Sequence, residues 1–340
     1  MTASGQHGHS GYVVAIVGAT GLIGQTLLTV LAERNTPIRE LRALATDGQG
    51  RRVRFRGDEI PVQAVGADTL AGADVVFMAA TKEASERWGP WAAERGSLVI
   101  DKSSRFRMDP DVPLVVPEVN AHAIGSKRLI ASPNCSTIQL VMALKPIADH
   151  REIRRVLVST YQAVSGTGRD AVEELDRETR ADVAGEPAPT PAIYPYPIAF
   201  NVIPQCDAFG DLDFDGEEWK LVRESQKILE RPLQLSATCV RVPVRVGHSE
   251  SVYLELDRPA DPEEVRAWLA AMPGVEVVDD PSRRRYPTPL MAAGRDTVLV
   301  GRIRRDPHRP EGLHLFVVSD NLRKGAATNA VQIMEAVMGR

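Results

Sequence analysis

Cysteine is scarce in this chain of 340 residues, which contains only Cys135, Cys206 and Cys239. The three lie far apart, are odd in number and form no C-x-x-C pair. This spacing excludes a disulfide framework and a cysteine zinc site, and we predict no bound metal. Unpaired cysteines are usual in a reducing compartment, so we expect a cytoplasmic protein.

Long apolar runs and an excess of positive charge are also missing. No segment approaches the ~18 uninterrupted apolar residues of a membrane span, and the opening MTASGQHGHSG lacks the regions of a signal peptide. We interpret this opening as a disordered tail. The formal net charge of −4 disfavours nucleic acid and anionic membranes as partners. With 43% apolar residues, the chain is expected to form two domains and to act on a small molecule.

Strand-like and helix-like segments alternate over roughly the first 130 residues. YVVAIVG is a β-branched run that ends in glycine, and LIGQTLLTVLAER after it has helical periodicity. Further strands are predicted at 41–46, DVVFMAAT and GSLVID, with the helix-like KEASERWGPWAAER between the last two. This alternation predicts an α/β fold with a Rossmann-type, doubly wound parallel sheet.

Strands dominate the second half, which we predict to be an α+β domain on a mixed or antiparallel sheet. The expected strands are RRVLVSTYQAVSG, LSATCVRVPVRV, SESVYLELD, TVLVGRIRR and LHLFVVSD, and the expected helices cover 168–183, 216–230 and 262–271. Residues 184–197 contain five prolines and should run irregularly over the surface or along a partner subunit. We predict a dinucleotide-binding domain at 1–133 that regains a final helix at 321–340, and a catalytic and dimerisation domain at 134–320.

Three glycines, Gly18, Gly21 and Gly24, form a G-x-x-G-x-x-G pattern between the first strand and the first helix. They allow a sharp turn, a close approach of backbone N–H groups to a pyrophosphate, and close packing of the helix on the sheet. The pattern favours dinucleotide binding over a tight turn without a ligand. Extended short-chain dehydrogenases share it, but they need a Tyr-x-x-x-Lys pair, and no tyrosine here has a lysine four places on.

Cys135 stands where a helix is expected to begin, in SPNCSTIQLVMALKPIA. Asn134 and Ser136 are suitable N-cap residues, and Ser136 with Gln139 has the spacing of a capping box. Free N–H groups and the helix dipole at this end favour a thiolate. A reactive thiol and an inert buried cysteine both remain compatible with the stretch.

A histidine and several arginines are further candidates. His248 follows an apolar strand in a glycine-containing corner, where a partly exposed ring would suit a general acid/base, although a lone histidine is more often structural. Arg241, seven residues earlier on the same predicted strand, faces the opposite side unless 243–247 contains a bulge. Arg105 and Arg107 follow two serines and suggest an oxyanion pocket, with solvated arginines as the alternative.

Taken together, the long stretches of the chain resemble aspartate-semialdehyde dehydrogenases of the branch typified by Gram-positive bacteria. The matching stretches are GATGLIG, SSRFRMDPDVPLVVPEVN, SPNCSTIQ, STYQAVSGTG, YPIAFNVIPQ, GEEWKLVRESQKIL, LSATCVRVPV, VGHSES and VSDNLRKGAATNAVQI. The resemblance implies NADPH-dependent reductive dephosphorylation of L-aspartyl 4-phosphate to L-aspartate 4-semialdehyde in amino-acid biosynthesis (lysine, threonine, methionine and isoleucine). It also implies a homodimer or homotetramer.

The resemblance also assigns roles to residues. It implies that Cys135 is the nucleophile that becomes an acyl-thioester, that His248 is its acid/base partner and that Gln162 orients the acyl group. The substrate-binding residues that it implies are Arg241 and Glu217 for the carboxylate and ammonium, and Arg107, Asn134 and Lys220 for the phosphate. Cofactor contacts are implied for Thr20, Gly21, Leu22, Ile23, Ser165, Gly166 and Asn321, beside the turn glycines Gly18 and Gly24.

Three stretches depart from the family pattern. Family members usually have Asn-Pro-Asn-Cys, Gly-Gly after the DVVFMAA strand and Asn in DNSS, whereas this chain has Ser132, Lys82 in TKEAS, and Lys102. A paralogue with an altered cofactor or substrate is therefore an alternative, as is a noncatalytic relative. An N-acetylglutamyl phosphate reductase fits less well, because Glu217 would have no free ammonium to bind.

The cofactor preference is open between NADP and NAD. Family members that use NADP usually end the second strand with Arg-Ser, whereas this chain has LATDGQGRRVR, with Asp47 and Gly48 near the expected arginine. A carboxylate there favours the ribose hydroxyls of NAD. Arg51 and Arg52, at the next strand, and Thr46 offer groups for a 2′-phosphate. We predict NADP from the family pattern and keep NAD as the alternative.

Overall fold

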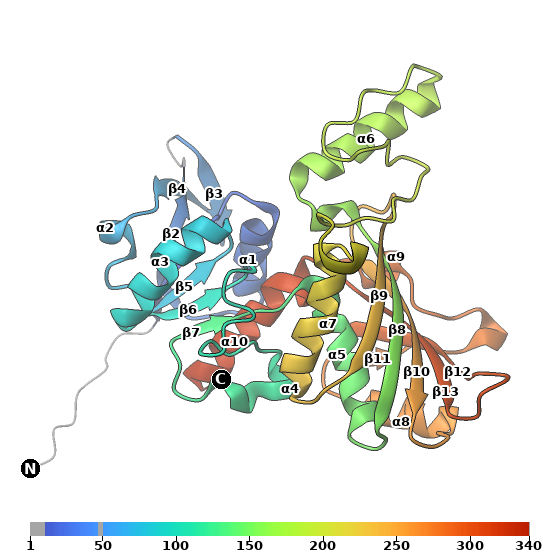
Figure 1. The fold of residues 1–340 in the computed structure, drawn as a ribbon. Helices are drawn as coiled ribbons and strands as arrows, with labels where there is room; N and C mark the ends of the chain where they lie inside the picture. Colours follow the sequence, from blue (N-terminus) through green and yellow to red (C-terminus); the bar gives the residue numbers. More distant parts are fainter. Residues whose placement is uncertain (1–10, 47–49, 340) are drawn as a thin grey trace, which may run out of the picture.

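Two β-sheets, with one helix buried between them, organise the computed structural model, which describes residues 11–46 and 50–339 (Figure 1). The first sheet has the strand order β3-β4-β2-β1-β5-β6-β7, and the second has the order β11-β12-β13-β10-β8-β9. The expected tail at residues 1–10 lies outside the described residues, as do Asp47 and Gly48.

The first sheet is the predicted doubly wound one. Its strands are β1 (Tyr12–Val17), β2 (Ile38–Ala45), β3 (Arg52–Phe55), β4 (Asp58–Ala64), β5 (Val75–Met78), β6 (Leu98–Asp101) and β7 (Leu129–Ala131). β1 pairs in parallel with β2 on one side and β5 on the other, and both of its faces are buried. Helices α1 (Leu22–Glu33) and α10 (Thr328–Met338) pack on one face, and α3 (Lys82–Glu94) and α2 (Ala67–Leu70) pack on the other. The Rossmann-type prediction is confirmed.

A hairpin at the edge of this sheet was not predicted. β3 pairs with β4 antiparallel through a turn at Arg56 and Gly57, whose φ angles are 52° and 93°. β3 has four residues, and β4 begins with two charged residues and contains a proline, so the hydrophobic pattern of this hairpin is weak. The second strand also begins three residues before the expected 41–46.

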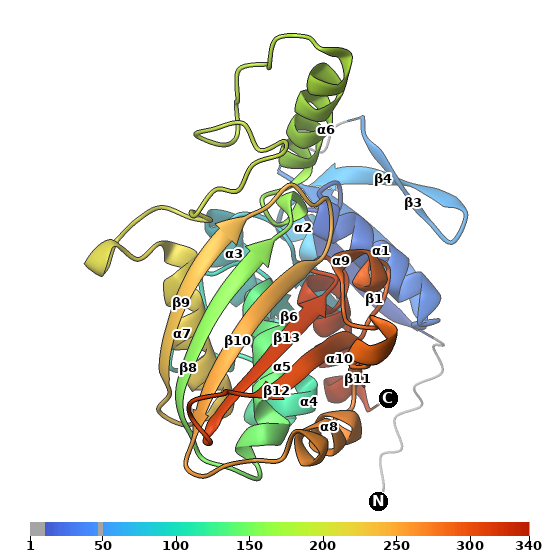
Figure 2. The same ribbon diagram turned by 90° about the vertical axis from the view of Figure 1, so that its right-hand side faces the viewer.

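The second sheet is mixed, as expected. Its strands are β8 (Ile153–Gln162), β9 (Gln234–Arg241), β10 (His248–Leu256), β11 (Val275–Val277), β12 (Val298–Arg305) and β13 (Gly312–Ser319). β8 runs parallel to β9 and β11 parallel to β12, whereas the other neighbours are antiparallel. Figure 2 views this sheet face-on, with α5 (Cys135–Ala148) behind it.

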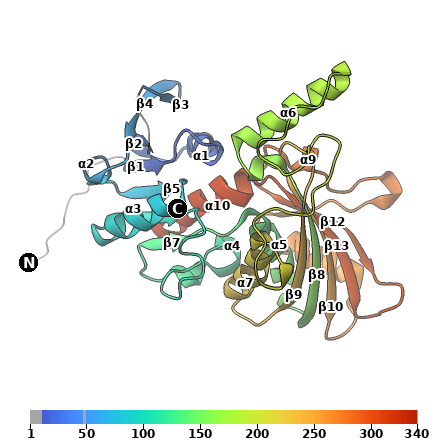
Figure 3. The ribbon, with the colours of Figure 1, turned by 45° about the horizontal axis from the view of Figure 1, so that its top comes forward.

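Helix α5 lies between the two sheets and is buried along nearly its whole length (Figure 3). Helices α7 (Gly216–Leu229), α8 (Pro262–Ala271) and α4 (Pro117–Asn120) pack beside it. The predicted helix at 262–271 is confirmed residue for residue, and 216–230 ends one residue early. The remaining short helix is α9 (Pro289–Ala292).

The proline-rich segment 184–197 is irregular, as predicted, and follows α6 (Arg169–Ala184), which projects from the body of the molecule (Figure 1). Two buried carboxylates of α6 hold the segment and the residues after it. Glu174 accepts the N–H groups of Ala192 and Ile193, and Glu178 accepts that of Ile198. Contact of this segment with a partner subunit stays a prediction.

The C-terminal helix begins later than the expected residue 321. Asp320 accepts the N–H groups of Leu322 and Arg323, a π-helical turn spans Arg323–Ala327, and α10 begins at Thr328. Over residues 11–46 and 50–339, we find no helix with the length and apolar character needed to cross a bilayer.

Candidate active site

Cys135 is the first residue of α5, where the chain leaves β7 at the carboxyl edge of the first sheet. The predicted helix start is therefore confirmed, with Asn134 at the N-cap, but the predicted capping box is wrong. Ser136 lies inside the helix, its hydroxyl has no partner among the described residues, and Gln139 instead accepts a bond from Ser319. The Asn134 side chain does not cap the helix, because it is committed to a neighbouring carboxylate.

Cys135 opens into a cavity of about 290 Å³ between α5, α7 and the ends of β8 and β9. The wall brings together most of the residues that the sequence predicts for catalysis and substrate binding. It is lined by Ser104, Arg107, Asn134, Cys135, Gln162, Gly166, Thr167, Cys206, Asp207, Glu217, Lys220 and Arg241. Three of these side chains are cationic, so the cavity is suited to an anionic ligand.

Glu217 is the centre of the polar contacts in this cavity. Its Oε1 accepts from Asn134 Nδ2 at 2.7 Å and from Gln162 Nε2 at 3.1 Å, and its Oε2 pairs with Lys220 Nζ at 3.1 Å. Burial opposes ionisation of Glu217, but the positive charge of Lys220 and the bond from Asn134 outweigh it and lower its pKa to about 2. Glu217 is therefore a carboxylate at neutral pH.

Glu224 is a residue of this region that the sequence reasoning missed. Its Oε1 accepts from Arg107 Nη1 at 3.0 Å, and its Oε2 accepts the backbone N–H of Asn134 at 2.7 Å. It thus fixes a cavity arginine and the residue before Cys135. Glu217, Lys220 and Glu224 have the i, i+3, i+7 spacing of one helix face, which was the available signal.

His248 and Arg241 come together through the main chain of Ala163. The prediction that they share a strand is wrong, because Arg241 ends β9, His248 begins β10 and β8 runs between these strands. The Ala163 N–H donates to His248 Nδ1 at 3.0 Å, and the Ala163 carbonyl accepts from Arg241 Nη1 at 2.8 Å. A Cβ on Gly166 would lie 3.0 Å from Arg241 Nη1 and 3.1 Å from His248 Nε2, so glycine leaves room for both groups.

The expected partial exposure of His248 is also wrong, because its side chain is fully buried. Burial, reinforced by the positive charge of Arg241, lowers the pKa of His248 to about 3. Because Nδ1 accepts a bond, the neutral ring has its proton on Nε2. Nε2 has no partner within the described part of the chain and faces Gly166.

The expectation that Cys135 is ionised to a thiolate is wrong in this structure. Burial and the negative charge of Glu217 raise the pKa of the thiol to about 11, against the positive charges of Lys102, Arg241 and Arg107. Burial is the largest of these influences, and the three cations do not offset it. Among the described residues, the thiol makes one hydrogen-bond contact, a long one of 3.7 Å to Asn134 Oδ1.

Cys206 lies closer to this chemistry than its apolar sequence context suggested. It is part-buried and lines the same cavity as Cys135. Burial raises the pKa of the Cys206 thiol, although the positive charge of Arg241 opposes the shift. Cys239 is fully buried in β9.

The glycine turn after β1 has the geometry that its spacing predicts. Gly18 has a φ of 89°, and a Cβ there would lie 2.3 Å from the Ala79 carbonyl oxygen. A Cβ on Gly24 would lie 2.2 Å from the Gly18 oxygen, whereas one on Gly21 would meet no protein atom closer than 3.5 Å. Packing within the protein therefore requires glycine at positions 18 and 24 but not at position 21. The open side of Gly21, at the N-terminus of α1, suits the close approach of a pyrophosphate.

A second cavity, of about 140 Å³, connects this turn with Cys135. Of the predicted cofactor residues it is lined by Ile23, Ser165, Gly166 and Asn321. The Ser165 hydroxyl and the Asn321 amide bond each other, and Asn321 Oδ1 also accepts the Gly247 N–H at 2.9 Å. A nicotinamide ring held here would lie beside the thiol.

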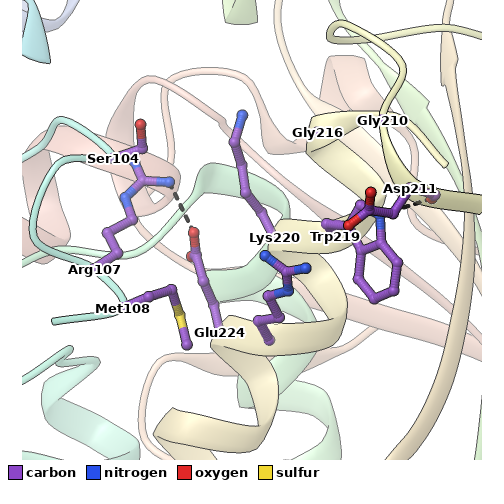
Figure 4. Close-up of a pocket in the computed structure, with 10 residues that line it drawn as sticks. Ser104, Arg107, Met108, Gly210, Asp211, Gly216, Trp219, Lys220 and Glu224 are labelled. Carbon is purple, nitrogen blue, oxygen red and sulfur yellow. Dashed lines mark hydrogen bonds and ion pairs between the residues drawn. The ribbon is translucent and has the colours of Figure 1, made fainter. Parts of the chain in front are cut away.

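An outer pocket of about 340 Å³ adjoins the cavity (Figure 4). Figure 4 shows Lys220 and Glu224 extending from α7, with the Arg107 guanidinium bonded to Glu224. Arg105 does not line these cavities. It is exposed and pairs with Glu86 at 2.8 Å, so the solvated alternative holds for Arg105 and not for Arg107, which is buried.

One cluster has the composition of a metal site. Ligand atoms of Asp215, Glu218 and Cys239 lie within 4.8 Å of one another. The carboxylates, however, accept backbone N–H groups, including those of Glu217 and Cys239, and Asp215 caps α7. These bonds occupy the oxygens that would bind an ion, so we assign no metal to the cluster.

Fold and site define a class of dehydrogenase with a dinucleotide-binding sheet and a cysteine at the domain junction. Residues 13–127 match the family described as semialdehyde dehydrogenase, NAD binding domain, and residues 144–324 match semialdehyde dehydrogenase, dimerisation domain. The chain is an oxidoreductase of this class.

Comparison with known proteins narrows the class. The chain is 49% identical to an aspartate-semialdehyde dehydrogenase of Aquifex aeolicus, over 96% of this chain and 98% of that one, and 47% identical to one of Bacillus subtilis, over 96% and 97%. A crystal structure of aspartate semialdehyde dehydrogenase II from Vibrio cholerae superposes with a TM-score of 0.93 at 45% identity, covering 97% of this chain and 99% of that one. The chain belongs to the aspartate-semialdehyde dehydrogenase family.

Proposed function

We propose that this protein catalyses the NADPH-dependent reductive dephosphorylation of L-aspartyl 4-phosphate to L-aspartate 4-semialdehyde through an acyl-thioester on Cys135. The main support is the position of Cys135 at the start of α5, opening into a cavity with three cationic side chains and the carboxylate Glu217. A substrate with a phosphate, a carboxylate and an ammonium group matches that set of charges.

In the proposed reaction, the sulfur of Cys135 attacks the acyl carbon of the substrate, and the thiol proton leaves with the phosphate group as hydrogen phosphate. The C–O bond to phosphate breaks, and inorganic phosphate leaves. A reduced nicotinamide cofactor supplies the hydride that converts the thioester to a thiohemiacetal. The C–S bond then breaks, the aldehyde is released and the sulfur recovers its electron pair.

The proposal gives a role to each site residue that the sequence predicted. Arg241 binds the α-carboxylate and Glu217 the α-ammonium, while Gln162 orients the acyl group. Arg107, Asn134 and Lys220 hold the phosphate. His248 is the acid/base candidate, and its Nε2 proton makes it a hydrogen-bond donor to the oxygen of the thiohemiacetal in the resting tautomer.

The glycine turn supports a dinucleotide as the cofactor, because Gly21 leaves open the space that a pyrophosphate needs. Thr20 precedes Gly21, and Leu22 and Ile23 follow it at the N-terminus of α1. Ser165 and Asn321 line the cavity beside Cys135. We propose NADP, with NAD as the alternative. A solved aspartate semialdehyde dehydrogenase from Candida albicans was described with NADP, at 26% identity and a TM-score of 0.73.

The choice between NADP and NAD is expected to depend on the residues after β2 and at the start of β3. Asp47 and Gly48 lie outside the described residues, and Arg52 donates to the Glu59 carbonyl oxygen at 2.8 Å. We expect Asp47→Ser to shift the kcat/KM ratio toward NADP, and the double change Arg51→Ala with Arg52→Ala to shift it toward NAD.

We also propose a homodimer or homotetramer built on the dimerisation domain, with the domain limits 1–133 with 321–340, and 134–320. A cytoplasmic location and membership of the Gram-positive-type branch are further proposals. Light scattering after size exclusion that gave only a 37 kDa species would count against the oligomer.

The direct test is an assay of the purified protein with aspartate semialdehyde, phosphate and each oxidised nicotinamide cofactor. We expect phosphate-dependent reduction of the cofactor, abolished by Cys135→Ala and largely retained by Cys206→Ala. A preference for N-acetylglutamate semialdehyde would favour a paralogue. Absence of turnover with intact cofactor binding would favour the noncatalytic alternative.

A further inference from the structure

Lys102, directly after β6, is a buried lysine whose ammonium bonds only to neutral oxygens. The residue is 7% exposed. Its Nζ donates to Ser132 Oγ and to the Pro133 carbonyl, each at 3.1 Å, and to the Gly325 carbonyl at 3.4 Å. Three acceptors for three N–H bonds fit the charged form, and no salt bridge to Lys102 occurs among residues 11–46 and 50–339. A buried cation with this surrounding needs an anion nearby.

The group that can supply the anion is Cys135. Lys102 and Cys135 line the same cavity of about 140 Å³. The Pro133 carbonyl lies two residues before Cys135, and a Cβ on Gly325 would be 3.1 Å from the Cys135 Cβ, so two of the lysine's acceptors belong to backbone that borders the cysteine.

We propose that Lys102 is a positioning residue whose ammonium stabilises the thiolate of Cys135. The inference rests on the proposed role of Cys135 as the nucleophile and adds the group that supports its ionisation. It assigns Lys102 to the electrostatics of the thiol and not to contact with substrate.

The other charged groups around the thiol are largely committed elsewhere. Arg107 pairs with Glu224 at 3.0 Å and Lys220 with Glu217 at 3.1 Å, whereas Arg241 donates to the Ala163 carbonyl and, like Lys102, has no carboxylate partner among the described residues. Glu217 opposes the thiolate. Lys102 and Arg241 are therefore the two cations near Cys135 that pair with no carboxylate in the described part of the chain, and both favour the thiolate.

The ammonium of Lys102 is itself sensitive to pH. Burial and the positive charge of Arg107 lower its pKa to about 7, against the negative charges of Cys135, Glu224 and Asp101. The lysine is charged below that pH and neutral above it. Lys102 therefore stabilises the thiolate most strongly below pH 7. This stabilisation is lost as the pH rises, because the lysine becomes neutral.

The test is the pH dependence of Cys135 alkylation by iodoacetamide, an uncharged reagent, followed by peptide mass spectrometry in a Cys206→Ala background. We expect Lys102→Met to slow alkylation about tenfold below pH 7, which corresponds to one unit of thiol pKa. The ratio of the wild-type rate to the variant rate should fall toward one above about pH 8, because Lys102 is then neutral. Lys102→Arg should retain most of the wild-type rate.

Lys227→Met is the matched control, because Lys227 Nζ also donates to three carbonyl oxygens, those of Arg107, Asp109 and Val112, but does not line the cysteine cavity. The ratio of the wild-type alkylation rate to the Lys227→Met rate should not depend on pH. Lys102→Gln, an uncharged donor, replaces the methionine variant if that variant does not fold. An unchanged rate or a pH-independent ratio for the uncharged variants would overturn the proposal. Preferential alkylation of Cys206 in the unmodified chain would instead overturn the assignment of Cys135 as nucleophile.

Discussion

The peptide N–H of Ala163 donates a 3.0 Å hydrogen bond to Nδ1 of His248, and this bond leaves Nε2 as the ring nitrogen that faces Gly166. The carbonyl of Ala163 accepts from Arg241, so one residue at the end of β8 places both side chains. Gly166, one turn further, leaves them the space that they share. The proton of the neutral imidazole is consequently presented on Nε2.

The pH profile of kcat/KM should show no limb from His248 near the usual histidine pKa. Burial and Arg241 hold the pKa of His248 near 3, so the ring is neutral throughout the range above about pH 4. His248→Ala should lower kcat by roughly 10²–10⁴-fold, the range expected for a lost acid/base or donor group. A limb near pH 6.5 that disappears in His248→Ala would contradict the assigned environment.

Glu217→Gln should act on the thiol and on the substrate in opposite directions. The variant removes the negative charge that raises the pKa of Cys135, so alkylation of Cys135 at pH 7 should become faster. It also removes the partner of the substrate ammonium, so KM for aspartate semialdehyde should rise about tenfold or more, whereas N-acylated analogues should change little. The two effects are measured by alkylation rates and steady-state kinetics. Slower alkylation in Glu217→Gln would show that the charge of Glu217 does not raise the pKa of Cys135.

Glu224→Gln should weaken phosphate binding although Glu224 does not contact the proposed nucleophile. Its carboxylate holds both Arg107 and the N–H of Asn134, and loss of a charged partner in a buried pair typically costs about 3–5 kcal/mol when the other charge is left behind. We expect a higher KM for phosphate with a smaller change in KM for the aldehyde. Glu178→Gln is a suitable control, since Glu178 is also buried and accepts backbone N–H groups, but in α6. Equal effects of the two variants would point to stability alone.

Gly21→Ala should weaken cofactor binding without unfolding the protein. A Cβ at this position meets no protein atom closer than 3.5 Å, so it would occupy only the space proposed for the pyrophosphate. Fluorescence titration should show at least about tenfold weaker binding, or 1.4 kcal/mol, with a thermal midpoint close to that of the unchanged chain. Gly24→Ala is the contrasting variant, because its Cβ would lie 2.2 Å from the Gly18 oxygen and should destabilise the fold. Unchanged affinity in Gly21→Ala would remove the glycine turn from the cofactor site.

Elements with a strong periodic pattern were predictable from the sequence. The first strand and helix with the glycine turn between them, and the helix at 262–271, follow from apolar spacing and turn residues. The hairpin of β3 and β4 was not, since β3 is too short for a clear alternation, β4 contains a proline, and the turn has no Asn-Gly or similar pair.

Relationships made by tertiary packing were the ones that the sequence did not reveal. Arg241 and His248 meet because β8 inserts between their strands, which no local pattern encodes. The pKa of Cys135 is raised by burial and by Glu217, and both follow from tertiary packing that the sequence around Cys135 does not show. Cys206 reaches the cavity from an irregular segment, so its nearness to Cys135 follows only from the fold.

The central claim, a covalent aspartyl group on Cys135, is tested most directly by a single-turnover experiment without phosphate. Protein mixed with aspartate semialdehyde and oxidised cofactor should reduce one equivalent of cofactor per site and then stop, because the thioester has no phosphate to accept its acyl group. Mass spectrometry of the quenched protein should find one aspartyl group on the peptide that contains Cys135, and added phosphate should release it. A burst with the adduct on another residue, or steady turnover without phosphate and without an adduct, would contradict the account.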